Sequence, residues 1–294
     1  SNEPDWYEAM ARYCDQVTIV QEHFGAPPII IAGDVFDKWN PPPELINFVI
    51  DKLPERCYGI PGQHDLPNHS YDEIHRSAFW TLVLSGKLTE IPPDESYSIP
   101  DSKVICYPFP WGFPIKSNKH YGGGGCWTHL AVCHSYIWTD DGNGHPEASK
   151  DQRTSKYRKK LRGYDCAVFG DNHKGFLQHA GAGEGKEGVC GDILNCGTLM
   201  RRRVDEIYYK PWIGVLWDDQ KITTIHLDCE QDQMLPLKNV AEDLKKEYGE
   251  EFVTELQKLA DSGLNFTQAV KTFLDRGEVS KKVRKLIAEF VSCS

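Results

Sequence analysis

Four short segments of the chain end an apolar run with side chains that can bind a metal ion. Asp after Gly is also common in turns, so one such segment alone would be weak evidence. Together the four combine carboxylate, imidazole and amide groups, which suit Mn²⁺ or a similar cation. The segments are Gly33-Asp34-Val35-Phe36-Asp37, Gly62-Gln63-His64-Asp65, Cys133-His134-Ser135 and Gly170-Asp171-Asn172-His173.

Strands must position these side chains, and apolar runs predict strands before each segment. Residues 28–32 contain three consecutive Ile and predict a fully buried strand. Helical spacing predicts helices between the strands, and strands that alternate with helices imply parallel βαβ units. Ligand-binding residues then lie at the carboxyl ends of the strands. The other predicted strands are 57–60, 104–107, 130–133 and 166–169, and the predicted helices are 6–24, 44–53 and 77–84.

The second half of the chain changes character twice. Residues 207–209, 212–217 and 222–227 predict strands, and the last two flank a turn at 218–221. Beyond Asp228, apolar residues recur at three- and four-residue spacing, which predicts helices. We therefore expect one domain over residues 1–228, which contains the four segments, and a helical module over 229–294.

Composition narrows the class of protein. Hydrophobic residues make up 40% of the 294 residues, which is ample for a buried core. No apolar run approaches the roughly 18 residues of a membrane span, and no signal peptide is recognisable. The ten cysteines lack zinc-type spacing, so we expect a reducing, cytoplasmic location.

Charge is distributed unevenly. The net charge of −10 argues against nucleic-acid binding by the whole surface. Residues 150–162 nevertheless carry seven Lys or Arg side chains. They form either a solvated helix face or a local patch that follows a phosphate backbone. The phosphate-contact candidates are Arg153, Lys156, Arg158, Lys159 and Lys160, together with Arg201 and Arg202 farther along the chain.

The order of the four segments resembles the motifs of the calcineurin-like metallophosphoesterase superfamily, which run D-x-H, G-D-x-x-D, G-N-H-[DE], a lone His and G-H-x-H. The resemblance covers roughly residues 28–175. The segment from Asn195 to Arg202 is also similar to the N-P-G-S region of SbcD-type DNA-repair nucleases of bacteria and phages. The resemblance implies an α/β fold, the calcineurin-like four-layer α/β/β/α sandwich, here with a C-terminal helical appendage.

The resemblance also implies roles for individual residues. Asp34 would bridge two divalent metal ions, with His173 on the first and Gln63, His134 and Asp171 on the second. His64 would be the general acid or electrostatic group beside the scissile phosphate. Asp37 and Asp65 would orient ligands or backbone. The two ions would activate water and neutralise developing charge on the phosphate.

The chain departs from the family pattern in three places. Gln63 replaces the family's Asn and reaches one methylene farther. Asp171 replaces a His, and a carboxylate favours Mn²⁺ or Mg²⁺ over Zn²⁺. The D-x-H motif is not found before the first helix, so we expect a further segment before Ser1. Without that segment the first metal site would lose half its ligands.

The leading hypothesis is an Mn²⁺-dependent DNA nuclease, exonuclease or endonuclease, of the SbcD type in DNA repair or recombination. DNA, an SbcC-type ATPase subunit and a second copy of the chain are the expected partners, and a membrane is not. Two alternatives stay open. One is a phosphatase or phosphodiesterase that acts on small substrates. The other is a catalytically degenerate subunit that serves as a binding protein or scaffold.

Overall fold

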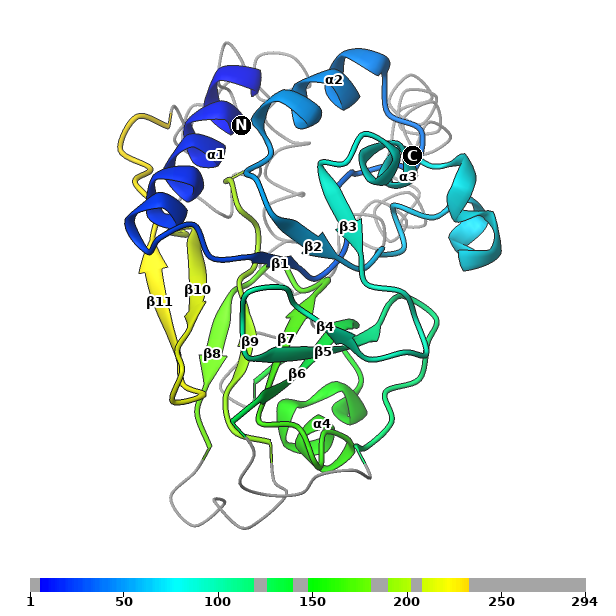
Figure 1. Cartoon of the computed structure of the whole chain (residues 1–294), viewed down its shortest axis with the longest axis vertical. Coiled ribbons are helices and arrows are strands. Elements are labelled where there is room, and N and C mark those ends of the chain that lie inside the picture. Colours follow the sequence, from blue (N-terminus) through cyan, green and yellow to red (C-terminus); the bar gives the residue numbers. More distant parts are fainter. Residues whose placement is uncertain (1–5, 119–125, 140–147, 181–189, 202–207, 233–294) are drawn as a thin grey trace, which may run out of the picture. The chain divides into compact units, whose positions relative to one another are not determined.

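The structure is a computed structural model that describes residues 6–118, 126–139, 148–180, 190–201 and 208–232 (Figure 1). The first part is a βαβαβ unit. Its strands β1 (Ile29–Ile31), β2 (Cys57–Gly59) and β3 (Leu88–Glu90) pair in parallel in that order. Helix α1 (Trp6–His23) precedes the unit, and α2 (Pro43–Lys52) and α3 (Ala78–Leu84) connect its strands. The predicted parallel βαβ arrangement is therefore confirmed.

A second sheet has six strands in the order β4-β5-β6-β7-β9-β8. Strands β5, β6, β7 and β9 are parallel, and β4 and β8 pair antiparallel at the two edges. The only α-helix between the strands of this sheet, within the described residues, is α4 (Thr154–Lys160). The strands are β4 (Tyr97–Ser98), β5 (Val104–Phe109), β6 (Thr128–His134), β7 (Cys166–Gly170), β8 (Phe176–Gln178) and β9 (Ile193–Asn195).

A two-stranded antiparallel hairpin follows, formed by β10 (Trp212–Leu216) and β11 (Ile222–His226), as the sequence predicts. The strand predicted at residues 207–209 does not form at Tyr208 and Tyr209; residue 207 is not described. Instead the Tyr209 hydroxyl donates a hydrogen bond to the carbonyl of Cys196, over 2.7 Å. Three short 3₁₀ segments complete the described elements, at Pro67–His69, Tyr71–Arg76 and Lys150–Gln152.

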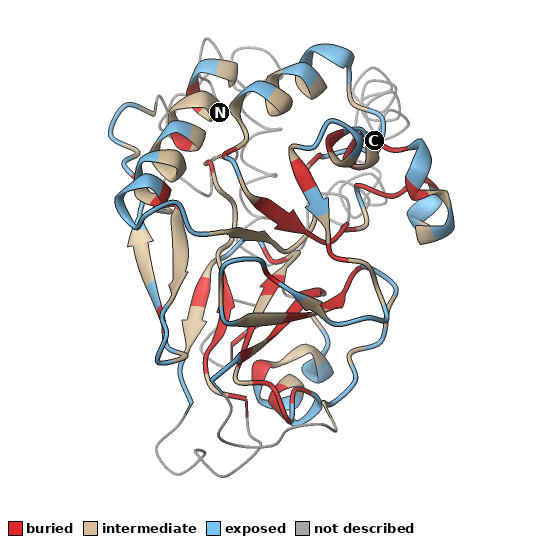
Figure 2. Ribbon diagram, in the orientation of Figure 1, coloured by how far each residue is buried: buried red, intermediate tan, exposed pale blue. Residues whose placement is uncertain are grey.

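Alternating side chains give each sheet two apolar faces. In β6, Leu130 and Val132 join a cluster with Tyr58 and Ile60 that fills the space between the two sheets. The alternate residues of β6 point to the opposite face of the sheet. They pack in a second cluster, which contains Leu161 at the end of α4. The other face of the three-stranded sheet packs against α2 and α3. Figure 2 shows that buried residues concentrate in the central strands, while the outer faces of α1 and α2 are exposed.

Strand β1 is less buried than predicted. Its three isoleucines are only half-buried, whereas all three residues of β2 are buried. The physical reason is position, because β1 lies at the edge of its sheet and β2 at the centre. A run of β-branched residues reports hydrophobicity but not the place of a strand in its sheet.

The predicted helical module at 229–294 lies outside the described residues from position 233 onward. Among the described residues, no helix has both the length and the apolar composition needed to cross a membrane. The nine described cysteines are all free thiols, and Cys106, Cys133 and Cys166 are fully buried in strands, as predicted.

Candidate metal centre

Asp34 lies in a sharp turn immediately after β1. Gly33 and Asp34 both have positive φ angles, 94° and 52°, and this left-handed backbone is uncommon for a residue other than Gly. The turn brings one carboxylate oxygen of Asp34 to the backbone N–H of His64, at 2.9 Å. The other oxygen lies 3.2 Å from Nε2 of His134. Asp34 therefore touches residues from both sheets.

His134 ends β6, and its side chain is fully buried. Its Nδ1 lies 2.7 Å from the carbonyl oxygen of Ala32. Because a carbonyl only accepts hydrogen bonds, Nδ1 must carry a hydrogen. Nε2 then faces two oxygens, Oε1 of Gln63 at 2.8 Å and Oδ2 of Asp34. Such a nitrogen needs either a second proton or a cation between it and the oxygens.

Electrostatics at His134 favour positive charge. Burial lowers the pKa of His134, but the hydrogen bond and the negative charge of Asp34 raise it more, so that the net pKa lies above its ordinary value. The position therefore stabilises a cation. A divalent ion coordinated by the same atoms would supply the positive charge that this position favours.

Asp171 follows β7 and completes the donor set. Its φ is 90°, and its carboxylate accepts a hydrogen bond from the Gln63 amide nitrogen at 3.1 Å. One donor atom from each of Asp34, His134 and Asp171 lies within 4.8 Å of the others. With the amide oxygen of Gln63, three oxygens and one nitrogen converge, a set that fits Mn²⁺ or Mg²⁺. The residues present therefore fit a divalent ion.

Three glycines make this convergence possible. A Cβ atom at Gly62 would lie 2.0 Å from Oδ1 of Asp34, and one at Gly33 would lie 2.2 Å from Nδ1 of His134. At Gly170, a Cβ would lie 2.1 Å from the carbonyl oxygen of Ala32. Any side chain at these positions would push the donors apart. The sequence signal for this constraint is the Gly that precedes the ligand in three of the four segments.

Substituting Gly62→Ala should weaken Mn²⁺ binding about tenfold or more, because Asp34 must move to admit the methyl group. Isothermal titration calorimetry of the full chain measures the affinity. Gly86→Ala is the control: its φ is 76°, so the backbone is strained, but no atom lies within 4 Å of the added carbon. Equal Mn²⁺ affinity of the two variants would contradict the steric argument.

His64 and His173 lie at the surface. The imidazole of His64 is exposed beside Gln63, where it can reach a bound substrate. His173 is also exposed, and its carbonyl accepts a hydrogen bond from the N–H of Thr198 at 3.2 Å. His173 is not part of the three-residue donor cluster found among the described residues. Its assignment to a first metal ion stays a prediction.

Asp65 and Asp37 differ sharply in environment. Asp65 is fully buried and accepts hydrogen bonds from the N–H groups of Val35, Phe36 and Gly62. Burial raises the pKa of its carboxyl to about 7, although those three donors act in the opposite direction. Asp65 thus ties the Asp34 loop to the Gln63 loop. Asp37 is exposed.

The basic segment divides into two kinds of side chain. Lys156, Lys159 and Lys160 are exposed, and the Lys160 ammonium lies 4.4 Å from the ring centroid of Tyr157. Arg158 is buried and donates to the carbonyls of residues 178, 179, 190 and 191. Arg153 stacks on Trp138, with 4.7 Å between the guanidinium carbon and the ring centroid. The exposed lysines are therefore better placed than Arg158 for the predicted phosphate contacts.

Substituting Arg158→Ala should lower the free energy of unfolding by about 3 kcal/mol, because buried carbonyls lose a charged donor. Urea denaturation followed by circular dichroism measures this loss. Lys159→Ala changes an exposed neighbour on the same helix and should cost no more than about 0.5 kcal/mol. Similar losses in both variants would show that the buried contacts of Arg158 contribute little.

Arg201 takes part in a group of polar contacts beside α1. Its guanidinium forms an ion pair with Asp232 at 3.0 Å, and Asp232 also accepts a hydrogen bond from Tyr13 of α1 at 2.5 Å. Arg202 lies outside the described residues. The phosphate contacts predicted for these two arginines stay predictions.

Asn195 connects the end of β9 to the loop after β7. It is buried at the end of β9, and its amide nitrogen donates to the carbonyls of Asn172 and Lys174, at 2.7 and 3.2 Å. These bonds hold the loop that carries Asp171 and His173. In the sequence the Asn195 segment stands out only by its resemblance to SbcD-type nucleases, and its contact with this loop is a property of the fold.

A comparison with protein-family models matches residues 6–175 to the calcineurin-like phosphoesterases. The matched range contains all four metal-capable segments and both strands that precede Asp34 and Gln63. No curated protein matches the chain.

Proposed function

The chain belongs to the calcineurin-like phosphoesterase family, and from this premise we propose that it is a DNA nuclease that hydrolyses phosphodiester bonds with divalent metal ions. Membership in the family supports metal-dependent phosphoester hydrolysis. The observation that carries the proposal is the convergence of Asp34, Gln63, His134 and Asp171 at the carboxyl ends of strands from two sheets. The clusters on both faces of each sheet support the four-layer α/β/β/α sandwich.

Each residue of the site would have its own role. Asp34, His134, Asp171 and Gln63 would hold one metal ion, and Asp34 and His173 would hold the other. When bound, the ions would activate water and offset negative charge on the phosphate. His64 is exposed next to this set and would donate a proton to the leaving oxygen. Asp65 would keep the two loops in register through its three backbone contacts.

The donor set supports a choice of metal ion. Asp171 replaces an imidazole with a carboxylate, and the amide oxygen of Gln63 is a hard donor. We therefore propose Mn²⁺ as the working ion, with Mg²⁺ as the second choice. The exposed lysines of α4 would contact the phosphates of DNA.

The proposal extends to partners. The similarity of the Asn195 segment to SbcD-type nucleases supports an SbcC-type ATPase as a partner, and the resemblance to the family supports a homodimer as the assembly. Size-exclusion chromatography with light scattering on the full chain tests the dimer, and a monomer at micromolar concentration would contradict it.

The deciding experiment compares two substrates with the full chain, stripped of metal by a chelator and then supplied with Mn²⁺. Linear double-stranded DNA should be degraded, and bis(p-nitrophenyl) phosphate should be hydrolysed more slowly. Hydrolysis of the small diester or of a phosphomonoester without any DNA cleavage would favour the small-substrate enzyme. Metal content by mass spectrometry below about one ion per chain would favour the scaffold.

A further inference from the structure

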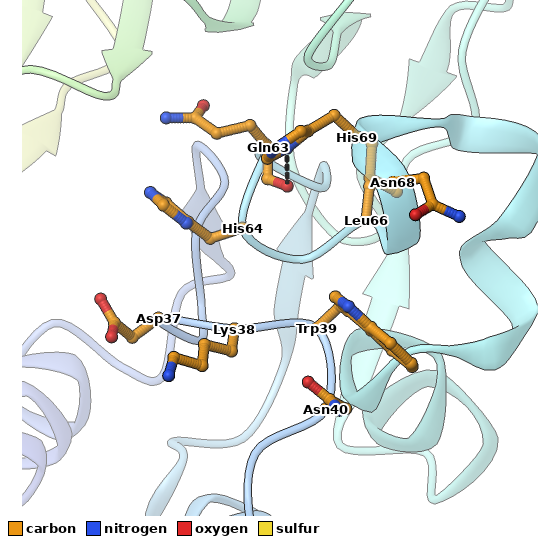
Figure 3. A pocket seen from close by; sticks show the side chains of 9 residues that line it. All are labelled: Asp37, Lys38, Trp39, Asn40, Gln63, His64, Leu66, Asn68 and His69. Atoms are coloured by element: carbon orange, nitrogen blue, oxygen red, sulfur yellow. Dashed lines mark hydrogen bonds between the residues drawn. The ribbon is translucent and has the colours of Figure 1, made fainter. Parts of the chain in front are cut away.

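An open pocket lies directly beside the metal centre (Figure 3). It has a volume of about 380 Å³ and is lined by the loop after β1 and the loop after β2. Its wall includes Gln63 and His64, and Gln63 also contacts His134 and Asp171. A substrate whose phosphate lies at the metal centre would therefore have this pocket beside that phosphate. The volume falls in the lower part of the range typical of small-ligand sites, which is about 300–1,000 Å³.

The far wall carries an aromatic ring and an amide. Figure 3 shows Trp39 and Asn40, from the loop after β1, across the pocket from His64 and Gln63, and it shows Asn68 on the same loop as His64. The backbone carbonyl of Trp39 accepts a hydrogen bond from the N–H of Ala78 at 2.8 Å, which anchors the loop to the start of α3. The guanidinium carbon of Arg76 lies 5.9 Å from the Trp39 ring centroid. The backbone of Trp39 is thus anchored to α3, and the Arg76 guanidinium lies near its ring.

The loop after β2 turns sharply at the pocket. Asn68 and His69 are consecutive residues with φ angles of 53° and 55°, in the left-handed region that Asn and His adopt more often than most other residues besides Gly. Nδ1 of His69 lies 3.0 Å from the backbone oxygen of Gln63, which links this turn to the metal-centre residue. The turn places Asn68 and His69 on the wall of the same pocket.

We propose that this pocket binds the nucleobase of the nucleotide next to the scissile phosphate, and that Trp39 is its stacking platform. Every base has a π-face, so an indole ring binds bases with little sequence preference. Asn40 offers an amide group to the base edge, and Lys38 offers a cation to the backbone phosphate. The proposal rests on the proposed function and specifies its substrate as a nucleotide chain with a base beside the bond to be cut.

Binding tests the pocket without hydrolysis. Isothermal titration calorimetry on the full chain with Mn²⁺ compares deoxyadenosine 5′-monophosphate with deoxyribose 5-phosphate, which carries the same phosphate but no base. The nucleotide should bind about tenfold more tightly or better, as expected for one base–aromatic stack. Trp39→Ala should remove this difference, and Trp39→Phe should restore most of it. Equal affinity of the wild-type chain for the two ligands would overturn the proposal.

Two controls separate this proposal from the proposed function. Trp217→Ala removes an exposed indole that packs against Phe24, and it should leave the difference between the two ligands unchanged. Hydrolysis of bis(p-nitrophenyl) phosphate reports the metal centre independently. If the diester is cleaved but the base gives no added affinity, the pocket proposal fails alone. If the base adds affinity but no diester is cleaved, the proposed catalysis fails alone.

Discussion

Asp34→Asn should lower kcat/KM for DNA cleavage by about 10³-fold or more and should reduce Mn²⁺ content below one ion per chain. Asp34 is the carboxylate that contacts both sheets, through the N–H of His64 and Nε2 of His134. The amide keeps the shape of the side chain but removes its negative charge. Metal ions supply several kcal/mol of transition-state stabilisation, and each 1.36 kcal/mol changes the rate tenfold.

The measurement pairs an exonuclease assay with metal analysis, and thermal denaturation shows whether the variant folds. Asp51→Asn is the matched control, because Asp51 is an exposed carboxylate near the end of α2 that pairs weakly with Lys52 at 3.8 Å. It should retain wild-type activity. Near-normal activity of Asp34→Asn would remove Asp34 from the metal centre and, with it, the central assignment of this site.

The largest stability effect is expected at Asp65. Asp65→Ala should lower the free energy of unfolding by about 3 kcal/mol or more, because three backbone N–H groups lose their acceptor in a buried place. Asp65→Asn should cost less, since its amide oxygen still accepts. Urea denaturation followed by circular dichroism compares the two variants.

Asp72→Ala provides the control for Asp65. Asp72 is exposed in the 3₁₀ segment Tyr71–Arg76, so its loss should change stability by no more than about 0.5 kcal/mol. If Asp65→Ala were as stable as Asp72→Ala, the three backbone contacts would not hold the loops together. The activity of Asp65→Asn adds a second readout, because loosened loops should weaken Mn²⁺ binding as well.

The sequence predicted the parallel strands and the residues at their carboxyl ends because both depend on local patterns. Hydrophobic runs identified β1, β2, β6 and β7, and the polar residues after them identified Asp34, Gln63, His134 and Asp171. The short strand β3, Leu88–Glu90, was not predicted, because three residues that include Thr and Glu carry little hydrophobic signal.

Long-range contacts could not be predicted in this way. Arg158 belongs to a basic run, and only the fold shows that its guanidinium is buried against four carbonyls while its lysine neighbours are exposed. The place of Trp39 in the pocket wall could not be predicted for a similar reason. Nothing in its sequence neighbourhood indicates that the loop after β2 faces it across a pocket.

The hydrogen bond from His134 to Ala32 joins a residue of the six-stranded sheet to the end of β1 in the other sheet. The described strands of the two sheets share no ladder, so side chains at this edge fasten one sheet to the other. An ion held by Asp34, Gln63, His134 and Asp171 would act as a clamp between them. Ion binding would then raise the free energy of unfolding, by about 2.7 kcal/mol when the free ion concentration is a hundred times Kd. The melting temperature of this chain would therefore rise with the concentration of the metal ion.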